Sequence, residues 1–185
     1  MKGKGLWWVA QITILIVGVS ICAPAQRRGD VHFRGTISDY TPMTGGGPWE
    51  VRGQWSLTIK HNGKGDFHAA LNMERSDLGV MNSGGGDLNN PADRNAHTHH
   101  VTLVNGDVTF PSAGTIEVSN GVVTITGNGA WPPPFGPTAT LKIDITGGSG
   151  PNSVTFSNIK VTFGADAEMH FGPNPINGVV RSVRY

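Results

Sequence analysis

The chain has 185 residues, of which 37% are hydrophobic and 15% charged, and its formal charge is +1 at pH 7. This length suffices for one domain with a hydrophobic core, whereas the low and nearly balanced charge argues against nucleic acid as a partner. Because Cys22 is the single cysteine, the chain forms no intramolecular disulfide.

The first 25 residues predict a secretory signal peptide. Lys2 and Lys4 precede an almost wholly apolar run from Leu6 to Ile21, and Ala23-Pro24-Ala25 supplies the small residues of a cleavage site. The apolar run is short for a membrane span, so we expect cleavage, no span in the mature chain, and a secreted, periplasmic or cell-envelope protein. Residues 26–185 then form a single antiparallel β domain, in which loss of Lys2 and Lys4 leaves 12 of the 14 basic residues against 13 acidic ones.

The first elements predicted in this domain are a strand from Val31 to Ser38 and a hairpin from Trp49 to Met73. In the hairpin, apolar and polar residues alternate on both sides of Asn62-Gly63, which is the strongest short-range signal for a β-hairpin. One face of the hairpin is therefore apolar, and further strands are needed to cover it. Residues 76–96 follow as a long segment without periodicity, and such a loop is often a lid or a binding loop.

From His97 onward the pattern predicts a meander of short strands. Asn105-Gly106 and Asn120-Gly121 predict two-residue turns, and a phase change between Phe156 and Ile159 predicts a bulge near Ser157. We expect no helix in residues 26–185. The predicted strands are His97–Val104, Asp107–Phe110, Thr115–Ser119, Val122–Thr126, Thr138–Thr146, Val154–Phe163 and Gly178–Tyr185.

About nine short strands predict an all-β fold, either an antiparallel up-and-down β-barrel of eight to nine strands or a two-sheet β-sandwich. Pairing of consecutive strands favours the barrel, because a meander closes without crossing connections.

One short motif resembles a known barrel family. Gly53-Gln54-Trp55 begins an eight-strand run, and Arg181 and Arg184 lie on the last strand, which resembles the G-x-W pattern of the calycins, the lipocalins and avidins. The resemblance implies that Trp55 packs near one of these arginines at a closed barrel end, and that the open end binds a small apolar ligand. The strand at Val31 precedes the G-x-W strand, and the T-D-Y motif of lipocalins is absent.

The sequence His97-Thr98-His99-His100 has metal-ligand spacing. On a strand, His97 and His99 project on the same face, close enough to share a divalent transition metal through their imidazole nitrogens, whereas His100 faces away. Val101 and Leu103 continue the His97 face as core-like residues, so the pair is expected at the rim of the barrel. A third ligand is expected from Asp87, Asp93 or His170.

Aromatic residues in or beside loops are candidate ligand-binding residues. Trp49, Trp131 and Phe135 lie among Pro, Gly and Thr, where exposed rings stack on sugars and buried rings cap a barrel end.

These observations favour an exported, non-enzymatic barrel that binds a small molecule, with the 76–96 segment gating one end. The chain has no G-x-S-x-G and no H-E-x-x-H motif. One alternative is a metal-dependent barrel enzyme that uses the His97/His99 pair. Another is a carbohydrate-binding or adhesive β-sandwich whose ligand is a glycan.

Overall fold

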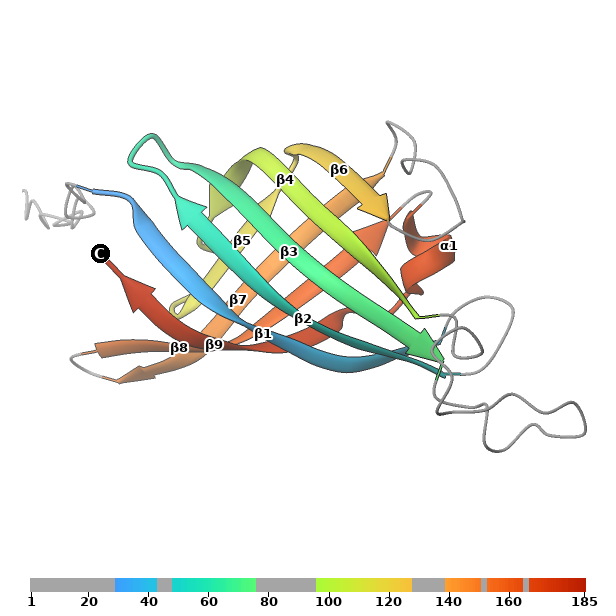
Figure 1. Cartoon of the computed structure of the whole chain (residues 1–185). Helices are drawn as coiled ribbons and strands as arrows, with labels where there is room; N and C mark the ends of the chain where they lie inside the picture. Colours follow the sequence, from blue (N-terminus) through green and yellow to red (C-terminus); the bar gives the residue numbers. More distant parts are fainter. Residues whose placement is uncertain (1–28, 43–47, 76–95, 128–138, 151–152, 165–166) are drawn as a thin grey trace, which may run out of the picture.

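Nine strands form one antiparallel sheet in the computed structural model, which describes residues 29–42, 48–75, 96–127, 139–150, 153–164 and 167–185 (Figure 1). The predicted signal peptide, most of the 76–96 segment, Trp131 and Phe135 lie outside the described residues. The elements are β1 (Val31–Pro42), β2 (Pro48–Ile59), β3 (Lys64–Arg75), β4 (His97–Thr109), β5 (Thr115–Ser119), β6 (Val122–Gly127), β7 (Thr140–Gly150), β8 (Ser153–Gly164), α1 (Glu168–Phe171) and β9 (Ile176–Arg184).

The sheet closes on itself. Its order is β3-β2-β1-β9-β8-β7-β5-β4-β6, and an additional pairing between β3 and β4 joins the two ends into an eight-strand barrel with β6 as an extra strand (Figure 1). The predicted all-β antiparallel barrel is thus confirmed, in preference to the two-sheet sandwich. Closure leaves the edges of these eight strands paired, which removes the unpaired backbone groups of an open sheet.

The barrel interior is filled by the apolar side of each alternating strand. On β3, for example, Phe67, Ala69, Leu71 and Met73 are buried, and the residues between them are more exposed. Burial of this apolar surface is the main favourable contribution to folding, at roughly 25 cal/mol per Å².

Trp55, the tryptophan of the G-x-W motif, is buried in the barrel interior. Its indole stacks on Phe67 of the neighbouring strand, with ring centroids 6.4 Å apart. Arg181 and Arg184 are exposed on β9, whereas Trp55 is buried. The packing of Trp55 near one of these arginines, which the calycin resemblance implies, stays a prediction.

The turn predicted at Asn105-Gly106 is wrong, because β4 runs through it without a break. Gly106 pairs with Gly65 and Leu103 pairs with Phe67, so two residues of β4 oppose Asp66 alone. Asn105 has a φ of 57°. Asparagine tolerates this left-handed conformation in a bulge as well as in a hairpin turn, so the dipeptide does not distinguish the two.

The second predicted turn, at Asn120-Gly121, separates β5 from β6, but these strands do not pair with each other. Both pair with β4 in one continuous register: Asp107 lies opposite Ser119, and Val104 lies opposite Val122. They are two halves of one interrupted strand, broken beside the β4 bulge. β5 continues the barrel by pairing with β7, whereas β6 remains beside β4.

The bulge predicted near Ser157 is confirmed. Thr146 pairs with Asn158 and Gly147 pairs with Phe156, which leaves Ser157 as the extra residue of β8.

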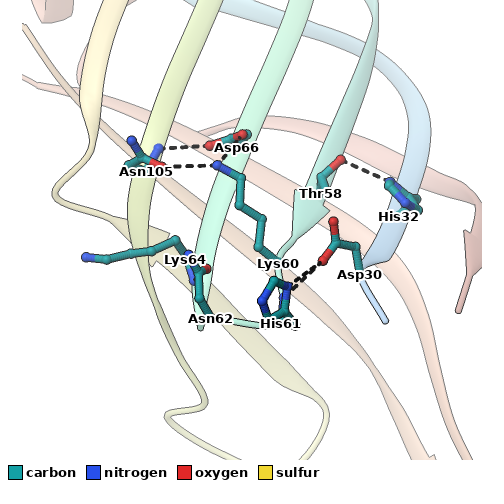
Figure 2. Close-up of polar contacts among 9 residues, drawn as sticks. All are labelled: Asp30, His32, Thr58, Lys60, His61, Asn62, Lys64, Asp66 and Asn105. Atoms are coloured by element: carbon teal, nitrogen blue, oxygen red, sulfur yellow. Dashed lines mark hydrogen bonds and ion pairs between the residues drawn. The ribbon is translucent and has the colours of Figure 1, made fainter. Parts of the chain in front are cut away.

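A polar network ties the β4 bulge to the β2–β3 turn (Figure 2). Asp66 accepts a hydrogen bond of 2.9 Å from the backbone N–H of Asn105 and forms an ion pair of 2.7 Å with the Lys60 ammonium. Lys60 also donates to the Asn105 side-chain oxygen at 3.0 Å. Burial alone raises the pKa of the Asp66 carboxyl, but these hydrogen bonds and the Lys60 charge outweigh burial and hold the pKa below its usual value.

We predict that Asp66→Asn lowers the free energy of unfolding by about 1 kcal/mol at pH 7, because a charge-assisted contact is lost. Since folding lowers the pKa of Asp66, its contribution is fully present above the unfolded value of 3.8 and is lost as the pH falls through the folded pKa. Urea unfolding at pH 7 and at pH 3 measures both effects.

The control is a double-mutant cycle with Lys60→Met. In that background Asp66→Asn should cost less, and equal costs in both backgrounds would contradict the network.

We also predict that Gly35→Ala destabilises the barrel. A Cβ at Gly35 would overlap the carbonyl oxygen of Val179 and lie 2.7 Å from the Trp55 ring, where β1 passes β9 at a bulge. Overpacking of this kind costs about 1 to 3 kcal/mol. Thermal unfolding of Gly35→Ala and of the control Gly29→Ala, whose Cβ would meet nothing within 4 Å, measures the difference. Equal melting temperatures would refute the close approach.

Candidate metal centre

Three histidines from two distant parts of the chain meet inside the barrel. His97 and His99 lie on the inner face of β4, because residues two apart on a strand point to the same side. His100 points outward and is exposed, as predicted. His170 comes from α1, and its ring nitrogen approaches both other histidines. Of the three candidates for a third ligand, the structure brings His170 to the pair, whereas Asp87 and Asp93 lie outside the described residues.

The short helix α1 positions His170, and the expectation of no helix in this region is wrong. Phe171 is fully buried and stacks on Phe163 of β8, with ring centroids 3.9 Å apart and an angle of 10° between the rings. The buried hydroxyl of Thr41 donates a hydrogen bond to the Phe171 carbonyl. Gly172 ends the helix with a φ of 84°. A helix of four residues is too short to produce a 3.6-residue pattern, which is why the sequence gives no signal for it.

The ring nitrogens converge at the spacing of metal ligands. His170 Nε2 lies 2.8 Å from His99 Nε2 and 3.3 Å from His97 Nε2, and one ligand atom from each histidine lies within 4.8 Å of the others. Nitrogens bound to zinc at about 2.0–2.1 Å with tetrahedral angles lie about 3.3 Å from one another. The observed distances therefore suit a shared ion with a small adjustment of the rings.

Burial keeps two of these imidazoles neutral. Burial, with a smaller contribution from the neighbouring histidines, lowers the pKa of His99 to about 3 and that of His170 to about 4. A backbone hydrogen bond with Thr126 acts in the opposite direction on His99. Neutral imidazole is the form that binds a metal, so both side chains present lone pairs at neutral pH without loss of a proton.

The other ring nitrogen of His99 faces the backbone of β6. A Cβ on Gly127 would lie 3.2 Å from His99 Nδ1, so the β6 backbone lies close to this side of the ring. Backbone contacts at the second nitrogen orient metal-binding histidines in many sites. The same contact leaves Nε2 directed toward His170.

Apolar side chains surround the cluster. The Trp49 ring meets His97 edge-on with centroids 5.4 Å apart, and the Phe171 ring meets His99 at 5.2 Å. Trp49 is only 4% exposed, so it is not the exposed aromatic that a glycan-binding surface requires. Its assignment as a ligand-binding residue stays a prediction, as do those of Trp131 and Phe135.

A pocket of about 340 Å³ opens beside His97, at the end of the barrel where β4 begins. His97 is the member of the cluster that lines this pocket. The pocket lining consists of Glu50, Arg52, Asn72, Met73, Glu74, Ala96, His97 and Thr98.

We predict that Phe171→Ala lowers the free energy of unfolding by about 3 to 5 kcal/mol, because it removes the stacked ring that holds α1. Phe110→Ala is the matched control: Phe110 is 62% exposed, and its loss should change stability by less than about 0.5 kcal/mol. Denaturant unfolding compares the two variants. A small effect of Phe171→Ala would show that α1 is not held by this contact.

No protein-family model, curated protein or solved structure matches this chain. Within the described residues, no helix has the length and apolar character to cross a membrane. The function is therefore inferred from the geometry of the three histidines.

Proposed function

We propose that this protein is a metal-binding β-barrel in which His97, His99 and His170 hold one transition-metal ion. The observation that carries the proposal is the convergence of three ring nitrogens on one point, with His170 Nε2 at 2.8 Å and 3.3 Å from its two neighbours.

Hydrogen bonding alone is a poor account of this arrangement. A ring nitrogen of neutral histidine carries either one proton or one lone pair. His170 Nε2 faces both His97 Nε2 and His99 Nε2, so it cannot form two good hydrogen bonds at once. A cation between the rings accepts a lone pair from each of them and removes the conflict.

The ligand type narrows the class of ion. Imidazole suits zinc, copper, iron and nickel, whereas calcium and magnesium require oxygen ligands. Three histidine ligands leave a fourth coordination position, which a further side chain, water or a small molecule can occupy. The pocket of about 340 Å³ has His97 in its lining, so it adjoins one of the three proposed ligands. The expected small-molecule binding stays a prediction.

The two other interpretations have less support. A lipocalin-like apolar cavity is disfavoured by the large side chains that fill the barrel, among them Phe33, Trp55 and Phe67. A glycan-binding face needs exposed aromatic rings, and Trp49 is buried.

Export forms part of the proposal. The predicted signal peptide supports a location outside the cytoplasm, where the mature chain has no cysteine with which to form a disulfide. A metal that binds the folded state alone stabilises it by about 2.7 kcal/mol at a hundredfold excess over its dissociation constant.

We predict that the chain, stripped of metal and then given Co²⁺ or Zn²⁺, binds one ion per molecule. His99→Ala and His170→Ala should reduce the stoichiometry to near zero, because each removes a ligand. Elemental analysis after desalting measures bound metal, and the visible absorption of Co²⁺ reports a tetrahedral site.

His100→Ala is the control, since His100 is adjacent in sequence but exposed on the outer face. It should bind one ion like the parent protein. Unfolding curves of metal-free variants separate loss of a ligand from loss of the fold. Absence of metal from the folded parent protein would overturn the proposal.

A further inference from the structure

Met73 lies beside the three histidines on the neighbouring strand. It is the direct partner of His97 in the ladder between β3 and β4, and both side chains are on the inner face of the barrel. Side chains of directly opposite residues have Cβ atoms about 4.5–5.5 Å apart. Met73 is 1% exposed, and it lines the same pocket as His97.

The thioether is a soft donor. Among the metals that imidazole binds, sulfur ligands favour copper, and thioether sulfur favours Cu(I) in particular. Zinc is bound by thiolate, imidazole and carboxylate groups. A methionine next to three histidines therefore favours one ion within the class proposed above.

The charge balance of the site favours the same ion. Within the described residues, the group of possible metal ligands that meets here holds three histidines and no carboxylate. Glu50 and Glu74 line the pocket, but they alternate in sequence with the inward-facing Val51 and Met73, and Glu50 forms an ion pair with Arg52.

Neutral ligands leave the whole charge of the ion uncompensated. The surrounding Trp49 and Phe171 rings are buried and apolar, so this charge lies in a medium of low polarity. The free-energy cost of burying an ion rises steeply with the magnitude of its charge. This apolar site therefore accommodates a monovalent ion better than a divalent one.

We propose that Met73 is the fourth ligand of the centre and that the site binds Cu(I) in preference to Zn²⁺. This inference rests on the proposed function, because it identifies the ion that the three histidines hold. It adds a residue that the sequence pattern did not single out.

The experiment compares the parent protein with Met73→Leu, a substitution that keeps the volume and apolar character of the side chain. Cu(I) is titrated without oxygen against a competing chelator, and Zn²⁺ is titrated separately. Met73→Leu should weaken Cu(I) binding by about ten- to a hundredfold, at least as much as loss of an outer-sphere partner does. Zn²⁺ binding should change by less than about twofold, since imidazole supplies its ligands.

X-ray absorption of the Cu(I)-loaded parent protein gives a test that needs no variant. A sulfur scatterer is expected in the first coordination sphere, and it should be absent from Met73→Leu. Unchanged Cu(I) affinity in the variant, equal losses for both metals, or nitrogen scatterers alone in the parent protein would each overturn the role of Met73. If the folded parent protein binds neither metal, the three-histidine centre itself fails, and this result is distinct from the others.

Discussion

The hydrogen-bonded ladder between β3 and β4 is the constraint on which the rest of the structure depends. It joins the two ends of the sheet into a barrel and so gives the apolar faces of all strands one shared interior. Its register also sets the site: Met73 lies opposite His97, and Leu71 lies opposite His99. A slip of one residue would turn both histidines to the outside, because side chains alternate along a strand.

β4 pairs with β3 along one edge and with β5 and β6 along the other, where β5 and β6 are two halves of one interrupted strand. The interruption leaves β6 next to the candidate metal centre. β5 leaves β4 to pair with β7, whereas β6 stays beside β4 and carries the backbone that faces His99. α1 lies at the same end of the barrel (Figure 1). Phe171 connects His99 of β4 with the stacked ring of Phe163 on β8, so the helix is held from two strands that do not pair with each other.

Burial and function are coupled at the histidines. An apolar surrounding lowers the pKa of His99 and His170, so the imidazoles are neutral without a partner charge. The same surrounding makes a bound cation costly unless its charge is small or its ligands compensate it. A site of this kind selects its ion by ligand softness and charge as well as by geometry. The aromatic rings around it thereby influence which metal is held, although they supply no ligand atom.

The sequence by itself determined which side chains face inward, because alternation along a strand is a local property that β2 and β3 retain in the barrel. The same property paired His97 with His99. Tertiary structure alone decided that Asn105 sits in a bulge, since a φ of 57° serves a turn equally well and the choice depends on which strand lies opposite. It also decided that His170, 71 residues from His99, completes the cluster. No local pattern encodes that meeting, because one turn of helix is placed by the stacking of Phe171 and not by its own periodicity.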